Sequence, residues 1–169
     1  MISTFVSLPI MLILSVIQTV AVSRVTLMGG SADLILLATV SWGVSEEDSS
    51  VFVWALVGGI FISLISAMPS AAVITSYLVI AGITRVIQIG LWQAPILVIL
   101  LSSFIGTIVK FIIDIIALQF MGIELNLSTS IKTTLAPNLI LNLFILFPVY
   151  LIMSDLAKRI SPKEEYESK

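Results

Sequence analysis

The chain has 169 residues, of which 59% are hydrophobic and 11% are charged, with a net charge of −2 at pH 7. Soluble domains have about 25% charged residues, so this composition and the mean hydropathy of +1.18 indicate an integral membrane protein and argue against nucleic-acid binding. Cysteine and histidine are absent from the sequence, which excludes disulfides, Cys/His metal sites and Ser-His-Asp or Cys-His catalytic groups.

The first predicted span covers residues 4–22 and has little polar content. It lacks a basic start and a small-residue cleavage site, so we do not expect a removable signal. Pro9 lies in the first two turns and is expected to bend the helix. Gln18 is expected to hydrogen-bond to a neighbouring helix, which is the usual role of a strongly polar side chain in lipid.

A second apolar segment, residues 32–45, follows a turn at Gly29 and Gly30. Asp33 can cap its start. At about 1.5 Å per residue this segment is shorter than the roughly 30 Å hydrocarbon core of a bilayer. We expect it to span with the help of loop residues, which predicts a compact all-α bundle of six transmembrane helices. The alternative is five spans and one re-entrant segment.

The third predicted span, residues 51–67, carries small residues along one side. These residues are Ala55, Gly58, Gly59, Ser63 and Ala67. Their spacing places them on one helix face, where they would let another helix approach closely. We therefore expect this span to be the central packing helix of the bundle. The alternative is that the small residues reflect only their general frequency in transmembrane helices.

The fourth predicted span, residues 71–91, contains Arg85 about two turns from its end. The arginine is expected to extend toward the lipid headgroups. Trp42, Trp54 and Trp92 fall near predicted helix ends, a placement typical of an interfacial aromatic belt.

The fifth predicted span, residues 95–121, has a polar face that includes Thr107, Lys110 and Asp114. Lys110 and Asp114 are four residues apart and can form an ion pair across one helical turn. Charged groups this deep in a span are costly and should face protein or water. Three roles remain open: an internal pair that fixes packing, a contact to a partner's membrane helix, or part of an ion or substrate pathway.

A polar segment, residues 122–134, is expected to be the longest loop, followed by the last span, residues 135–156. Pro137, Asn138 and Asn142 lie near the start of this span, and the asparagines are expected to hydrogen-bond to neighbouring helices. The transmembrane domain thus covers residues 1–157.

The charged tail, residues 158–169, holds four of the basic residues. With six spans both termini lie on one side of the membrane, together with Arg85. Because positive charge favours the cytoplasmic side, both termini are expected in the cytoplasm.

Two stretches resemble MreD, the bacterial rod shape-determining membrane protein. They are GGIFISLIS in the third span and APNLILNLFILFPVY in the last span, where Pro137 and Asn142 match the family pattern. The resemblance covers nearly the whole chain, including its length and charged end. Members of the family often carry an aspartate near the position of Ser63, so a role of that carboxylate does not transfer to this chain.

The resemblance implies a non-catalytic scaffold without cofactors in the bacterial cytoplasmic (inner) membrane. Such a protein contacts lipid and works in cell-wall elongation with a bitopic MreC-like protein, the actin-like MreB, and a peptidoglycan polymerase and transpeptidase. It would thereby regulate cell shape and peptidoglycan synthesis. A homo-oligomer is compatible with the sequence.

The alternative function is the substrate-binding membrane component of an energy-coupling vitamin transporter. In that case Lys110, Asp114, Asn138 and Asn142 would line a ligand pocket near one membrane face. Sparse aromatic and polar side chains in the outward loops weigh against this function. An intramembrane enzyme is less well supported, because Asp33 and Asp114 are far apart in sequence and have no histidine or metal partner.

Overall fold

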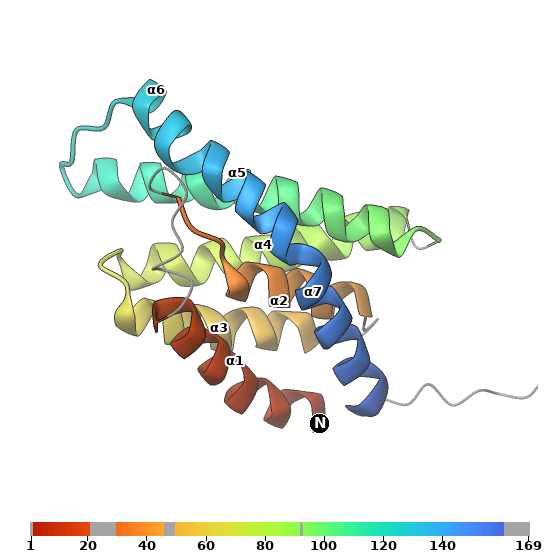
Figure 1. Ribbon diagram of the computed structural model, residues 1–169. Helices are drawn as coiled ribbons and strands as arrows, with labels where there is room; N and C mark the ends of the chain where they lie inside the picture. Colours follow the sequence, from red (N-terminus) through yellow and green to blue (C-terminus); the bar gives the residue numbers. More distant parts are fainter. Residues whose placement is uncertain (1, 21–29, 46–49, 92, 161–169) are drawn as a thin grey trace, which may run out of the picture.

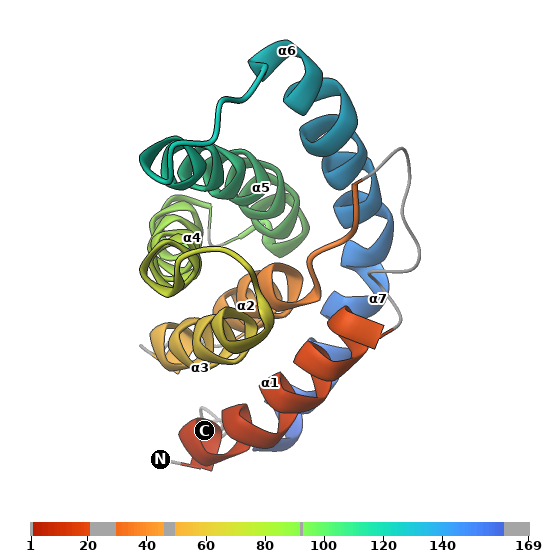
Figure 2. The same cartoon turned by 90° about the vertical axis from the view of Figure 1, so that its left-hand side faces the viewer.

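The computed structural model describes residues 2–20, 30–45, 50–91 and 93–160, with residues 2–4 described by their backbone alone. The described chain is a bundle of α-helices (Figure 1), which confirms the all-α expectation. Its helices are α1 (Ile2–Val20), α2 (Leu34–Ser45), α3 (Ser50–Ile65), α4 (Ser70–Gly90), α5 (Pro95–Phe120) and α7 (Ala136–Ile160), and the short turns α6 (Leu127–Ser130) and η2 (Ile131–Leu135) lead into α7. The start of α1 and the end of α7 lie near the same end of the bundle (Figures 1 and 2).

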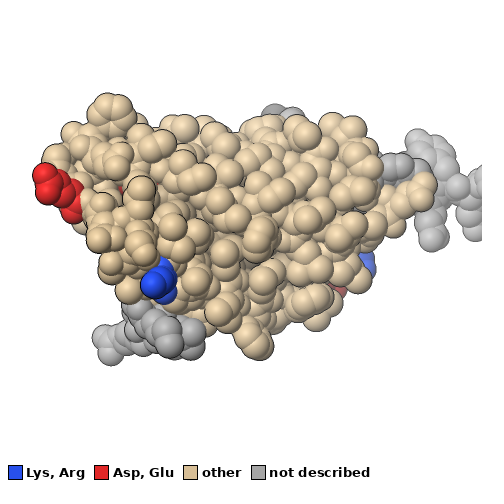
Figure 3. All heavy atoms as spheres, turned by 90° about the horizontal axis from the view of Figure 1, so that it is seen from above, with Lys and Arg blue, Asp and Glu red and all other residues tan. Residues whose placement is uncertain are grey.

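Three helical stretches are long and apolar enough to cross a membrane, namely Ser70–Gly90, Pro95–Phe120 and Leu127–Ile160. On the face shown in Figure 3, charged side chains lie near the two ends and the surface between them is uncharged. These features indicate a membrane protein. The remaining helices α1, α2 and α3 are apolar but shorter over their described side chains, so the six-span bundle stays a prediction.

Helix α2, and not α3, lies at the centre of the bundle (Figure 2). It contacts α1, α3, α4, α5 and α7, and its residues 34–43 are all buried. The expectation that the third span is central is therefore wrong. A helix enclosed on all sides needs apolar or small residues all round, as in LILLATVSWG, whereas α3 exposes Phe52, Leu56 and Ile60 on its outer face.

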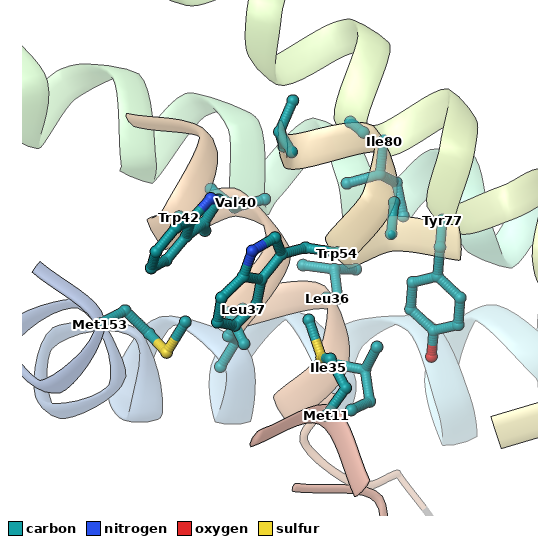
Figure 4. Packing of buried hydrophobic residues seen from close by; sticks show 14 of the residues in the cluster. Met11, Ile35, Leu36, Leu37, Val40, Trp42, Trp54, Tyr77, Ile80 and Met153 are labelled. Carbon is teal, nitrogen blue, oxygen red and sulfur yellow. The ribbon is translucent and has the colours of Figure 1, made fainter. Parts of the chain in front are cut away.

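Trp42 and Trp54 belong to the core and not to an interfacial belt (Figure 4). Both side chains are fully buried, and their rings stack with centroids 4.0 Å apart and an interplanar angle of 18°. Trp42 Nε1 donates a hydrogen bond to Ser50 Oγ at 2.8 Å. This pair fixes the end of α2 against α3, because an offset aromatic stack adds to the area that each ring buries. Trp92 lies outside the described residues.

The polar segment before the last span is helical over more than half of its length, from Leu127 onward. Asn126 caps α6 by accepting a hydrogen bond from Thr129 N at 3.2 Å, and the helical stretch then continues from Leu127 to Ile160. The expected loop over residues 122–134 is therefore shorter than predicted. The loop begins at Gly122, whose φ of +79° is a backbone conformation that favours glycine.

Candidate functional site

The start of α2 lies inside the bundle, where polar side chains of other helices bind its backbone. Gln18 of α1 makes two such bonds: its Oε1 accepts from Leu34 N at 2.8 Å, and its Nε2 donates to Ala32 O at 2.7 Å. The first N–H groups of a helix lack partners within the helix, and leaving them unpaired in a buried place is costly. Gln18 therefore makes the interhelical contact predicted for it.

Two asparagines of α7 bind the same segment from the opposite side. Asn138 Oδ1 accepts from Ser31 N at 2.8 Å, and Asn142 Oδ1 accepts from Asp33 N at 2.7 Å. The Asn142 amide also donates to Thr107 Oγ1 of α5 at 2.8 Å. Asn142 is almost fully buried, and its side chain links α7 to α5 and to the residue before α2.

The segment leading into α2 passes directly over the start of α7. A Cβ atom placed on Gly30 would lie 2.5 Å from Asn138 Oδ1 and 2.7 Å from Pro137 Cβ. Only a residue without a side chain allows this approach. Pro137 is itself buried in α7. Pro137 and Asn138 therefore serve as the surface on which the segment before α2 rests.

The Asp33 carboxylate is the N-cap of α2 and also the centre of a hydrogen-bond cluster. Its Oδ1 accepts from Leu36 N at 2.9 Å, as predicted for a cap. Tyr77 Oη of α4 lies 3.1 Å and 3.0 Å from the two carboxylate oxygens, and Lys110 Nζ of α5 lies 3.5 Å from Oδ2. The links to Tyr77 and Lys110 were not predicted, because they join residues far apart in the sequence.

Lys110 bridges two carboxylates that are far apart in the sequence. Its Nζ lies 3.3 Å from Asp114 Oδ2 on the same helix face, which confirms the predicted ion pair, and 3.5 Å from Asp33 Oδ2. The ammonium also lies 5.8 Å from the centre of the Tyr77 ring, within the range of a cation–π contact. The three charged side chains are 16–27% exposed. They form a cluster of two acidic groups and one basic group between α2 and α5.

A cavity of about 240 Å³ adjoins this cluster between α5 and the last helical stretch. All four residues that the transporter alternative named, Lys110, Asp114, Asn138 and Asn142, line it. The rest of the lining consists of Asp33, Leu36, Met68, Thr107, Phe111, Ile115, Leu118, Leu125, Ser130 and Thr134. The lining is therefore mixed, because α5 contributes both charged and apolar side chains and the last helical stretch contributes polar ones.

The small-residue face of α3 is used along only part of its length. Ala55, Gly58 and Gly59 are buried, and a Cβ on Gly59 would lie 3.2 Å from the Ile74 Cα of α4. Ser63 is half-buried, and Ala67 is exposed beyond the end of α3 at Ile65. Close approach of helices is therefore confined to the part of the face from Ala55 to Gly59.

A matching polar contact holds the other end of α2. Gln88 Nε2 of α4 donates to Val44 O at 3.2 Å, and Gln88 Oε1 accepts from Arg85 Nη1 at 2.7 Å. Because the last carbonyls of a helix also lack partners within it, this contact satisfies the end of α2. Arg85 thus acts through Gln88 on the core helix and does not belong to the cavity.

Groups of three or more acidic side chains that could hold a metal ion are absent from the described parts of the chain. Comparison of the chain with known protein families, curated proteins and solved structures finds no match. The resemblance to MreD therefore rests on the sequence patterns given above.

Proposed function

We propose that this chain is a non-catalytic scaffold of the bacterial cell-wall elongation complex. In this proposal it lies in the inner membrane with six crossings and cytoplasmic termini, and it holds the membrane helix of a bitopic MreC-like protein. MreB and a peptidoglycan polymerase and transpeptidase complete the complex. The sequence resemblance suggests this function, and the outer surface of the bundle supplies a place for the partner helix.

The observation that carries the proposal is an apolar groove where α1 and α7 diverge. It has a volume of about 420 Å³ and is lined by Ile10, Ile13, Leu14, Ile152, Met153, Asp155, Leu156 and Arg159. A second groove of about 310 Å³ follows the other side of α1, against α3. Helices associate in lipid by filling such surface grooves, since burial from water offers no driving force there.

The experiment is photo-cross-linking in cells from a single position in the groove. A photoreactive side chain at Ile13, which is 56% exposed, should capture a bitopic protein with an extracytoplasmic domain. The matched control is Ile116 of α5, which is 46% exposed on another part of the surface. Equal capture at both positions, or capture of no bitopic protein from Ile13, would contradict the proposal.

The second candidate is the substrate-binding component of an energy-coupling vitamin transporter. It is favoured by one observation, the cavity that Lys110, Asp114, Asn138 and Asn142 line together. Affinity purification from mild detergent separates the two functions. Recovery of a pair of cytoplasmic ATPases with a transmembrane coupling subunit would replace the scaffold proposal by the transporter one.

A further inference from the structure

Among the described residues, the lining of the cavity beside α5 has one more acidic side chain than basic side chains. Asp33, Asp114 and Lys110 are the charged members of its lining, and together they have a formal charge of −1. The side chains that face this cluster from the other packed helices are neutral: Tyr77 on α4 and Asn142 on α7. An ionised carboxylate inside an apolar bundle is unfavourable unless a proton or a partner of opposite charge neutralises it.

The two carboxylates differ in how fully they are bound. Asp33 accepts hydrogen bonds from Leu36 N and Tyr77 Oη and lies next to Lys110. Within the described residues, Asp114 has Lys110 as its hydrogen-bond partner, and its side chain is 27% exposed beside the cavity. An ionised carboxylate can accept about four hydrogen bonds. Asp114 is therefore the group with free capacity for a positively charged donor.

The size and lining of the cavity favour an organic cation over a bare metal ion. A volume of about 240 Å³ exceeds what a single dehydrated ion fills, and approaches the lower end of small-molecule sites, roughly 300 Å³. Phe111, Ile115 and Leu118 provide an apolar wall, while Ser130 and Thr134 face the cavity from the other side. A small amine fits this lining, because its ammonium group can face the polar side chains and its short carbon chain can face the apolar wall.

We propose that the cavity binds a primary ammonium group, with Asp114 as its principal acceptor. The lining includes Met68, from the turn between α3 and α4, and Leu125, from the connection between α5 and α6. These two connections lie at the same end of the bundle (Figure 1). A ligand can therefore reach the cavity from water or from the headgroup layer. The ammonium group can belong to a free small amine or to the ethanolamine headgroup of a lipid. This site does not depend on the scaffold proposal.

The test is thermal unfolding of the purified full-length protein in amine-free buffer with ethanolamine hydrochloride or an equal concentration of NaCl. Ethanolamine should raise the midpoint and NaCl should not. Asp114→Asn makes the cluster neutral and should weaken the apparent affinity by roughly tenfold or more, the scale of a lost charged hydrogen bond. Lys110→Gln leaves a charge of −2 and should keep or strengthen the response.

The matched control is Asp155→Asn, which removes an exposed carboxylate outside this cavity and should leave the response unchanged. Thr134→Phe narrows the cavity without altering its charges and should abolish binding. This variant replaces Asp114→Asn as the test if Asp114→Asn does not fold. Equal shifts with both salts, no shift in the unchanged protein, or loss of binding in Lys110→Gln with retention in Asp114→Asn would overturn the proposal.

Native mass spectrometry after reconstitution distinguishes the two sources. Retention of phosphatidylethanolamine over phosphatidylglycerol by the unchanged protein, lost in Asp114→Asn, identifies the lipid headgroup. A response to ethanolamine without lipid selectivity identifies a free amine. The absence of both would overturn the proposal.

Discussion

Helices α2 and α3 are both short and apolar, with 12 and 16 residues, yet they differ in how completely other helices surround them. Helix α2 is enclosed by other helices, whereas α3 buries one face and turns Phe52 and Leu56 outward. The difference lies at the helix ends. Side chains of α1, α4 and α7 bind the backbone at both ends of α2. In an apolar bundle, partners for the terminal backbone groups therefore identify the central helix better than apolarity does.

The largest effect is expected from Gly59→Leu, which separates α3 from α4. The added side chain would meet the Ile74 backbone, whose Cα lies only 3.2 Å from the position of a Cβ. Overpacking against backbone should lower the free energy of unfolding by about 3 kcal/mol, measured by thermal or denaturant unfolding in detergent. Gly82→Leu is the control, since a Cβ there meets nothing within 4 Å. Equal effects of the two changes would mean that close approach at α3 is unimportant.

Asn142→Leu should have the next largest effect, by releasing the start of α2. It leaves Asp33 N without its acceptor and Thr107 Oγ1 without its donor. An unpaired buried polar group costs about 1–3 kcal/mol, so we expect a loss of about 2–3 kcal/mol. Asn126→Leu provides a control, because Asn126 is exposed and caps only the short α6. A loss no greater than that of the control would show that α2 does not depend on α7.

Tyr77→Phe tests a single contact at the start of α2, because it removes only the hydroxyl that binds Asp33. The ring and its packing stay, and Asp33 keeps Leu36 N and Lys110 as partners. The loss should be about 1.5–2 kcal/mol, the lower part of the range for a hydrogen bond to a charged group. Unfolding of Tyr77→Phe, of Asp33→Asn and of the double variant measures the coupling between the two side chains. Simple addition of the two effects would show that the hydroxyl does not act through Asp33.

Gln88→Leu should have the smallest effect, because it frees the more exposed end of α2. The Val44 carbonyl loses its donor and is only half-buried, so water can replace the contact. We expect a loss of about 0.5–1 kcal/mol in the same unfolding measurement. A loss as large as that of Asn142→Leu would mean that both ends of α2 are held equally.

The apolar segments and the ion pair of Lys110 with Asp114 were predictable from the sequence, since both follow from local periodicity. The central position of α2 was not, because lipid and protein interior select the same apolar residues. The expectation for Trp42 and Trp54 was wrong for the same reason, because a buried ring and an interfacial ring can both stand near the end of a helix in the sequence. The link from Asp33 to Tyr77 and Lys110 joins residues 44 and 77 positions apart, which no local pattern records. The one available signal was the set of polar side chains within apolar spans, each of which needed a partner.

The start of α2 also sets the order in which the protein can be assembled. The asparagines that complete it stand 107 and 109 residues later in the chain than the N–H groups they accept from. At about 5–20 residues per second, a ribosome needs roughly 5–20 s to supply them. During that interval the N–H groups of Ser31 and Asp33, in the segment that leads into α2, lack acceptors that lipid cannot supply. Insertion of the last helix is therefore the step that allows α2 to take its final place, and truncation before Asn138 removes the means of completing the core.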